Sequence, residues 1–257
     1  FRGEALASIG AVARVQLTSR QPDADVGHVI RVDGGAVTPP RPCAARPGTT
    51  VEVRDLFFNV PARRKFLRTN QTESGHVSEQ FVRLALAQPG IAFSLRSQGR
   101  AMYTTEATTD RRQRIADLCG PELAKVLLPI QRAGEGVRVE GLVAPPAESR
   151  GSTKWEYVFV NGRYIRDRFV AHAVKEAYRS LIDPSRSAVA FIFIRMDPSE
   201  VDVNVHPTKI EVRFRDGQLV HGQVLAGLKE TLNRGDLTPA ATLDRPTDQA
   251  SEPPTGR

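Results

Sequence analysis

The sequence is poor in cysteine, tryptophan and methionine, and it lacks a long apolar run. Its 257 residues include two cysteines, one tryptophan and two methionines. Cys43 and Cys119 form no C-x-x-C pair, which argues against a disulfide framework or a cysteine zinc site and fits a reducing cytoplasm. The longest strongly apolar run, 188–194, is far shorter than the roughly 18 to 20 residues of a membrane-spanning helix. No charged-then-apolar leader opens the chain, so we expect no secretory signal.

The common catalytic signatures are also missing. The sequence contains neither a G-x-x-x-x-G-K-[ST] phosphate loop nor a G-x-S-x-G nucleophile elbow. Gly134-Glu135-Gly136 begins like a dinucleotide fingerprint, but Val139 stands where the third glycine is needed, so a turn is the better interpretation. The five histidines lack metal-ligand spacing along the chain, and no metal site is expected from them; they are His28, His76, His172, His206 and His221.

What the sequence does contain is positive charge and enough apolar material for a core. Lysine and arginine number 36 against 29 acidic residues, which gives a net charge of +7. That balance favours a polyanionic partner: DNA, RNA, a nucleotide or an acidic membrane. Hydrophobic residues make up 40% of the chain, so it can form one large domain or two smaller ones.

Alternating and helical apolar patterns predict a mixed α/β chain. Helices are expected at 4–9 and at 77–87, the second with Val77, Phe81 and Leu84 on its buried face. A polar stretch at 105–114 predicts a domain boundary. The remaining expected elements are strands at 12–19 and 49–53, hairpins through Asp33-Gly34-Gly35, Gln98-Gly99 and Asn161-Gly162, strands at 137–143, 156–160, 190–195 and 210–214, and helices at 167–181 and 218–232.

The helix expected at 167–181 carries an apolar stripe at its buried positions. The residues of that stripe are Val170, Val174, Ala177 and Leu181.

Three short segments carry chemistry suited to phosphate. Arg2 and Gly3 precede a helix start, where free N–H groups and a cation can cradle an anion, although an ordinary helix start has the same pattern. Gly48 and Thr49 offer close backbone approach and a hydroxyl, as does any turn that enters a strand. Lys209 follows an extended proline-containing segment and can reach a phosphate, or it can be a solvated surface lysine.

Four motifs together resemble the MutL family of DNA mismatch repair proteins, in that family's order and spacing. They are FRGEALASI at 1–9, GTTVEVRDLFFNVPARRKFLR at 48–68, VNGRYIRDR at 160–168 and DVNVHPTKIEVRF at 202–214. The resemblance extends from residue 1 to about residue 232 and is highly specific in combination. It implies an α/β (α+β) fold: a truncated Bergerat-type GHKL ATPase sandwich at 1–108, then a ribosomal-protein-like transducer α/β domain at 109–235. Residues 236–257 are expected to be a disordered linker, because they offer almost nothing apolar to bury.

The resemblance also assigns roles to the phosphate-suited residues. Arg2 and Gly3 match the end of the ATP lid, and Gly48 and Thr49 match the fourth nucleotide motif. Lys209 matches the transducer lysine that reaches the γ-phosphate, which makes it the expected catalytic residue as well as an ATP-binding one. A cation supplied by a second domain can couple the presence of the γ-phosphate to a domain rotation.

A second set of residues is assigned to DNA. Arg168 matches a family residue of the DNA-binding groove, and Arg163 and Arg166 flank it, as phosphate contacts without base reading. The implied function is that of an ATP-binding and ATP-hydrolysing matchmaker that binds DNA and couples mismatch recognition to repair. The implied partners are DNA, a mismatch-sensor protein, a downstream nuclease or helicase, and a second copy in a homodimer, in the cytoplasm at the nucleoid and without a membrane.

The first residue is Phe1 and not methionine, and we expect the chain to be a fragment. In the family, the general-base glutamate, the magnesium-binding asparagine and a D-x-G-x-G motif precede the lid, and a dimerisation domain follows the linker. ATP and Mg²⁺ are therefore expected as cofactors of the full-length parent, whereas this chain alone is expected to bind neither tightly and to be inactive. The alternatives are a non-catalytic DNA-binding or interaction module, or another GHKL ATPase such as a type II topoisomerase subunit.

Overall fold

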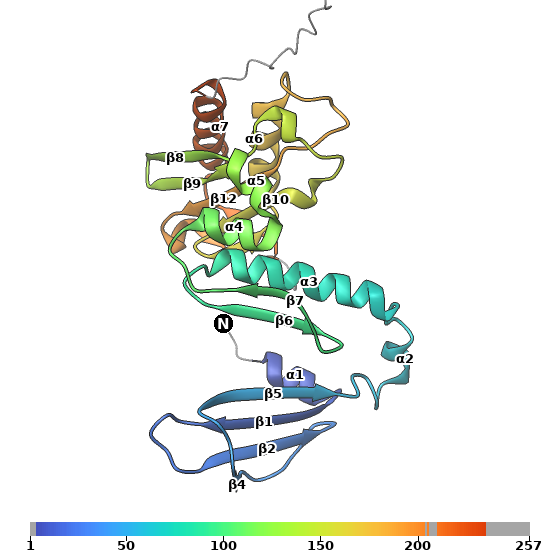
Figure 1. Cartoon of the computed structure of the whole chain (residues 1–257). Helices are drawn as coiled ribbons and strands as arrows, with labels where there is room; N and C mark the ends of the chain where they lie inside the picture. Colours follow the sequence, from blue (N-terminus) through green and yellow to red (C-terminus); the bar gives the residue numbers. More distant parts are fainter. Residues whose placement is uncertain (1–3, 204, 206–209, 235–257) are drawn as a thin grey trace, which may run out of the picture. The chain divides into compact units, whose positions relative to one another are not determined.

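The computed structural model describes residues 4–203, 205 and 210–234, and the chain separates into two compact units (Figure 1). The first unit is Phe1–His76 and the second is Val77–Arg257. The sequence predicted a domain boundary at 108, whereas the helix and the hairpin between 77 and 105 are grouped with the second unit. The assignment of 1–108 to the ATPase domain and of 109–235 to the transducer domain remains a prediction.

The first unit is an antiparallel sheet with short helices. Its strands follow the order β3-β2-β1-β5, and β4 also pairs with β2. Val15 of β1 lies opposite Val32 of β2 and Val53 of β5, so apolar side chains meet across the three strands. The elements are α1 (Ala5–Gly10), β1 (Arg14–Arg20), β2 (Gly27–Asp33), β3 (Ala36–Val37), β4 (Arg41–Cys43), β5 (Gly48–Arg54) and α2 (Pro61–Arg64).

The second unit is a mixed sheet covered by helices on both faces. The five-stranded sheet has the order β11-β10-β12-β9-β8, and β12 runs parallel to β10 and antiparallel to β9. The helices are α3 (Asn70–Ala87, which begins before the division), α4 (Arg111–Cys119), α5 (Pro121–Val126), α6 (Arg168–Tyr178) and α7 (Gly217–Arg234). The sheet strands are β8 (Leu128–Gly134), β9 (Val137–Val143), β10 (Glu156–Val160), β11 (Arg163–Ile165) and β12 (Ala190–Arg195). The described part of the second unit also contains two separate antiparallel strand pairs. They are β6 (Phe93–Ser97) with β7 (Arg100–Thr105), and β13 (Val201–Asp202) with β14 (Arg213–Phe214). Short 3₁₀ turns lie at Pro146–Glu148, Thr153–Trp155 and Pro198–Glu200.

The central strand β12 explains this layered arrangement. Its residues alternate between two hydrophobic clusters, with Ile192 and Ile194 in one and Phe191 and Phe193 in the other. The first cluster contains residues of α6 and α7, and the second contains residues of α3, α4 and α5. A strand buried on both faces needs a nearly continuous apolar run, which is what residues 188–194 provide.

Most of the predicted elements are confirmed. The predicted strands at 137–143, 156–160 and 190–195 coincide with β9, β10 and β12. The turn through Asn161 and Gly162 joins β10 to β11, and both residues have positive φ, as a tight hairpin turn requires. The hairpin through Gln98-Gly99 joins β6 to β7.

The predicted buried face of the helix at 77–87 is wrong at two of its three residues, whereas the third, Phe81, is half-buried and packs against the second hydrophobic cluster. Val77 and Leu84 are 56% and 59% exposed. The helix instead buries Val82, Ala85 and Leu86, together with a charged residue, Arg83. A buried arginine does not register in an apolar pattern, so the hydropathy of the sequence favoured a neighbouring face.

Smaller corrections concern two element ends. The strand predicted at 210–214 is limited to β14, Arg213–Phe214. Leu181, predicted on the buried stripe of α6, lies beyond the end of the helix and is 38% exposed. The other members of that stripe, Val170, Val174 and Ala177, are buried as predicted.

The linker predicted at 236–257 lies outside the described residues. Among the described helices, none has the length and apolarity to cross a bilayer.

Candidate functional site

The three arginines assigned to DNA lie on one continuous segment of the second unit. Arg163 opens β11, Arg166 follows this strand, and Arg168 is the first residue of α6. Arg166 and Arg168 are exposed, whereas Arg163 is half-buried. Between the two exposed arginines, Asp167 caps α6 by accepting hydrogen bonds from the backbone N–H groups of Phe169, at 2.8 Å, and Val170, at 3.0 Å. This cap stabilises the start of α6, whose first residue is Arg168.

Arg166 and Arg168 line a cavity of about 720 Å³, and Arg163 is not among its lining residues. Two tyrosines, Tyr157 and Tyr164, form part of its wall. The charged side chains that line it are five cations, Arg83, Lys154, Arg166, Arg168 and Arg213, and four carboxylates, Glu79, Glu156, Asp167 and Glu211. The cavity thus combines basic and aromatic side chains, the types that contact phosphates and stacked bases.

A network of side chains holds Arg166 at the cavity wall. Its Nε donates to the hydroxyl oxygen of Tyr164 at 3.3 Å, and its Nη2 lies 3.9 Å from a carboxylate oxygen of Glu79. Glu79 also forms an ion pair with Arg83, whose guanidinium carbon lies 4.1 Å from the ring centre of Tyr164. The hydrogen bond with Tyr164 raises the pKa of Arg166, so its charge is secure. Its side chain remains 68% exposed and can reach an incoming anion.

Glu156 is the most perturbed carboxylate of this cavity. It lies half-buried at the start of β10, and burial raises the pKa of its carboxyl group from 4.5 to about 7. Burial likewise raises the pKa of Asp167, although the N–H groups that this residue caps oppose the shift. Below neutral pH, Glu156 is therefore mostly protonated, and the cations of the cavity face less negative charge.

Replacing Glu156 by glutamine should stabilise the protein at pH 8 and leave its stability unchanged at pH 4.5. A raised pKa means that the folded state holds the proton more tightly than the unfolded state. The parent therefore loses stability as the pH rises from 4.5 to about 7. The cost approaches about 3 kcal/mol for a fully buried group, and the partial exposure of Glu156 reduces it to about 2 kcal/mol. Urea unfolding followed by circular dichroism at the two pH values measures it.

The matched control for this prediction is Glu122→Gln. The Glu122 side chain is 82% exposed and pairs with Lys125 on the surface, so its loss should change the unfolding free energy by less than about 0.5 kcal/mol at either pH. If Glu156→Gln and the parent show the same stability at pH 8, the burial of this carboxylate carries no cost and the prediction is wrong.

Of the residues assigned to ATP, the structure describes Gly48 and Thr49. Gly48 begins β5 with φ +116°, which favours glycine, and nothing lies within 4 Å of where its Cβ would be. The Thr49 hydroxyl lies 2.9 Å from that of Ser19, its directly opposite partner near the end of β1. The open backbone and the exposed hydroxyl fit an approaching phosphate. Arg2, Gly3 and Lys209 lie outside the described residues.

Sequence reasoning missed the residues that complete the cavity. Arg83, Lys154 and Arg213 come from α3, from the turn before β10 and from β14. Arg83 and Lys154 lie outside the four motifs, and Arg213 lies within the motif at 202–214 but was assigned no role there. Arg83 gave a weak signal, because it is a charged residue within an otherwise apolar stretch of its helix.

Residues 115–233 match the protein-family model described as "DNA mismatch repair protein, C-terminal domain". The chain is 46% identical to the DNA mismatch repair protein MutL of Pseudomonas fluorescens over 260 residues, which cover 100% of this chain and 41% of that protein. It is equally identical, at 46%, to the MutL protein of Azotobacter vinelandii, covering 99% of this chain and 40% of that protein. The chain thus spans about two fifths of the length of these relatives.

Solved structures agree with the sequence comparison. The MutL ATPase domain of Aquifex aeolicus complexed with ADP matches with a TM-score of 0.64 at 26% identity, over 86% of this chain and 76% of that one. The B-subunit of DNA gyrase from Myxococcus xanthus matches with a TM-score of 0.53 at 14% identity, over 88% of this chain and 69% of that one, and shows the fold alone. The fold class is therefore the α/β class of GHKL ATPase domains, as predicted. By motif order, family model and full-chain identity, this chain belongs to the MutL family of DNA mismatch repair proteins.

Proposed function

We propose that this chain is the part of an ATP-dependent mismatch repair matchmaker that binds DNA and senses whether the bound nucleotide carries a γ-phosphate. The observation that carries the DNA proposal is the pairing of Arg166 and Arg168 on one cavity wall with three further cations. Cations on adjoining elements can follow the phosphates of a duplex without reading its bases.

The nucleotide side of the proposal rests on the relatives and on Gly48. A MutL ATPase domain of similar fold carries ADP. Gly48 and Thr49 offer ATP an open backbone and a hydroxyl, and we assign Arg2 and Gly3 to its phosphates and Lys209 to the γ-phosphate. No described residue of this chain is assigned to Mg²⁺, which the full-length protein would hold with other residues.

The wider role follows from the family and is part of the proposal. The full-length protein would act in the cytoplasm as a homodimer, between a mismatch-sensor protein and a downstream nuclease or helicase. The 46% identity to MutL proteins favours this function over that of a topoisomerase subunit, because the gyrase likeness is 14% identical. A non-catalytic DNA-binding module is the second candidate, and ATP turnover by the full-length protein separates the two.

Arg168→Glu should weaken duplex binding about tenfold at low salt, to a similar degree for every sequence. The change removes a cation from the cavity wall and adds a repulsive charge at the start of α6. The plot of log affinity against log salt should become shallower by about one, because one phosphate contact is lost. Fluorescence anisotropy with two unrelated duplexes, over a salt series, measures both effects.

Arg179→Glu is the control, because it makes the same charge change at the opposite end of the same helix. It should retain most of the affinity and the parental salt dependence. Equal loss in both variants would mean that overall charge, and not the cavity wall, determines binding. Unchanged affinity in Arg168→Glu would remove Arg168 from the DNA interface.

A further inference from the structure

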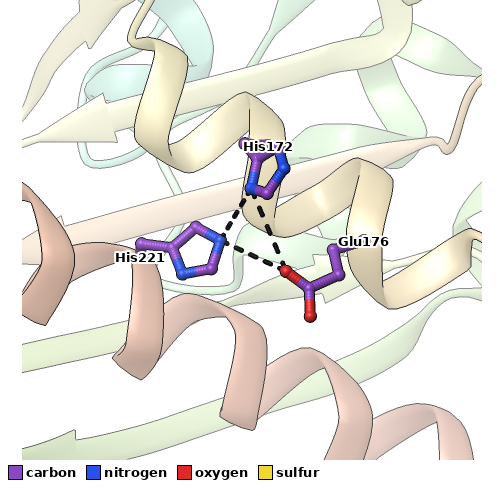
Figure 2. Close-up of side chains that lie close together, drawn as sticks. All are labelled: His172, Glu176 and His221. Carbon is purple, nitrogen blue, oxygen red and sulfur yellow. Dashed lines mark hydrogen bonds and ion pairs between the residues drawn. The ribbon is translucent and has the colours of Figure 1, made fainter.

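Two histidines and a glutamate from neighbouring helices meet on the second unit (Figure 2). His172 and Glu176 lie one helical turn apart on α6, so their side chains share a face, and His221 approaches from α7. The Nδ1 atom of His172 lies 3.0 Å from Nε2 of His221. The Oε2 atom of Glu176 lies 3.9 Å from the first nitrogen and 3.5 Å from the second.

These three distances suit a single metal ion. Zinc bound at about 2.0 to 2.1 Å by nitrogen or oxygen in a tetrahedron has ligand atoms about 3.3 Å apart. The separations in the cluster lie on both sides of that value, so shifts of a few tenths of an ångström would bring all three atoms into the coordination sphere. Imidazole and carboxylate are ligands that suit zinc and other first-row transition metals.

The surroundings orient the carboxylate and leave room for the ion. Lys229 of α7 lies 3.5 Å from Oε1 of Glu176, the oxygen that does not face the histidines. Holding one oxygen in this way turns the other toward the imidazoles, as partners behind metal ligands do. The His172 side chain is 61% exposed, Glu176 29% and His221 16%, so an ion can enter from solvent and keep water as a further ligand.

We propose that His172, Glu176 and His221 form a binding site for Zn²⁺ or a similar transition metal that ties α6 to α7. Ligation needs both facing nitrogens unprotonated, so the proton held between the two rings must leave that position when the ion enters. The spacing of residues 172, 176 and 221 along the chain did not predict the site, because the packing of α6 on α7 brings them together. The site is separate from the cavity that contains Arg166 and Arg168, whose lining residues include none of the three.

Calorimetric titration of the tag-free 257-residue chain with Zn²⁺ tests the proposal, with Co²⁺ absorption as the spectroscopic readout. We expect one ion per chain and the visible absorption of a tetrahedral cobalt site. At a zinc concentration about 100 times the Kd, the melting temperature should rise by about 5 to 10 °C, because the ion binds the folded state.

His172→Ala and Glu176→Gln should each weaken zinc binding by more than about 100-fold, since even partners behind the ligands contribute 10- to 100-fold. His172 is the most exposed member, so its variant should fold, which circular dichroism verifies. His28→Ala is the matched control, because it removes an exposed histidine of β2 and should leave binding unchanged. Absence of stoichiometric binding, or equal binding by His172→Ala, would show a metal-free histidine pair and overturn the proposal.

Discussion

Arg114→Ala is expected to lower the free energy of unfolding of the second unit by about 3 to 5 kcal/mol. Arg114 lies on α4, its side chain is fully buried, and carbonyl oxygens surround its guanidinium. Its Nη1 donates to Ala85 at 2.7 Å, and its Nη2 lies 2.7 to 2.8 Å from the carbonyl oxygens of Pro89, Ile91 and Glu106. One side chain therefore provides hydrogen-bond donors to backbone carbonyls at the end of α3, in the loop after it and in the segment that follows β7.

The size of the effect follows from the acceptors that the substitution would leave without a partner. Each buried polar group without a partner costs about 1 to 3 kcal/mol. Four strongly bonded carbonyls would exceed our estimate if all stayed dry. Water entering the space left by the side chain will satisfy some of them, because the walls of that space are polar. Ala85 lies in the last turn of α3, where the carbonyls have no partner within the helix, so their bonding to a cation also stabilises the helix terminus.

Urea unfolding followed by the fluorescence of Trp155 measures this prediction. Trp155 is the single tryptophan of the chain and packs against the cluster that includes Ile115 of α4, so it reports on the second unit. Arg96→Ala is the control: Arg96 also donates to a backbone carbonyl, that of Gly99 at 2.8 Å, but on the exposed β6–β7 hairpin. It should cost less than about 0.5 kcal/mol. A loss below 1 kcal/mol for Arg114→Ala would mean that water satisfies the carbonyls without difficulty.

Arg114 also shows where sequence reasoning fails in this chain. The stretch 105–114 is polar and charged, and it predicted a domain boundary, which remains a prediction. Nothing in that stretch indicated that the side chain of its last residue is buried more deeply than most apolar ones. Arg83 misled the prediction for α3 in the same way. A charged residue becomes buried when backbone carbonyls or an aromatic ring can receive it, and those partners come from elements that the local sequence does not specify.

The elements that were predicted well have signals within a few residues. Asn161 and Gly162 can adopt positive φ, and apolar strands flank them, so the β10–β11 hairpin is encoded locally. The strand predicted at 190–195 overlaps the run 188–194, which is apolar at every position and suits the burial of β12 on both faces. The candidate site likewise has one part that the local sequence indicates and another that depends on tertiary packing. The motif order gave Arg166 and Arg168, whereas the cavity partners from α3 and β14 and the meeting of α6 with α7 depend on tertiary packing.

Lys209→Ala should reduce ATP turnover about 10²- to 10³-fold in a protein that carries the complete ATPase. If the lysine meets the γ-phosphate, it stabilises negative charge that grows in the transition state. Removing one such group typically costs about 3 to 4 kcal/mol of activation free energy. DNA affinity without nucleotide should stay unchanged, because the proposed DNA contacts are Arg163, Arg166 and Arg168. A solvated surface lysine would instead give parental turnover and a stability change of less than about 0.5 kcal/mol.

A fusion of this chain with the flanking segments of the Pseudomonas fluorescens relative supplies the assay, since the chain spans 41% of that protein. Steady-state turnover is compared for the parent fusion, Lys209→Ala, and the control Lys175→Ala, which removes an exposed lysine of α6. Titration with a non-hydrolysable ATP analogue separates a loss of binding from a loss of rate. A lysine that acts on the growing charge should lower the maximal rate more than it lowers the affinity for the analogue. Equal turnover of Lys209→Ala and Lys175→Ala would assign Lys209 to the solvated surface and leave the γ-phosphate to another residue.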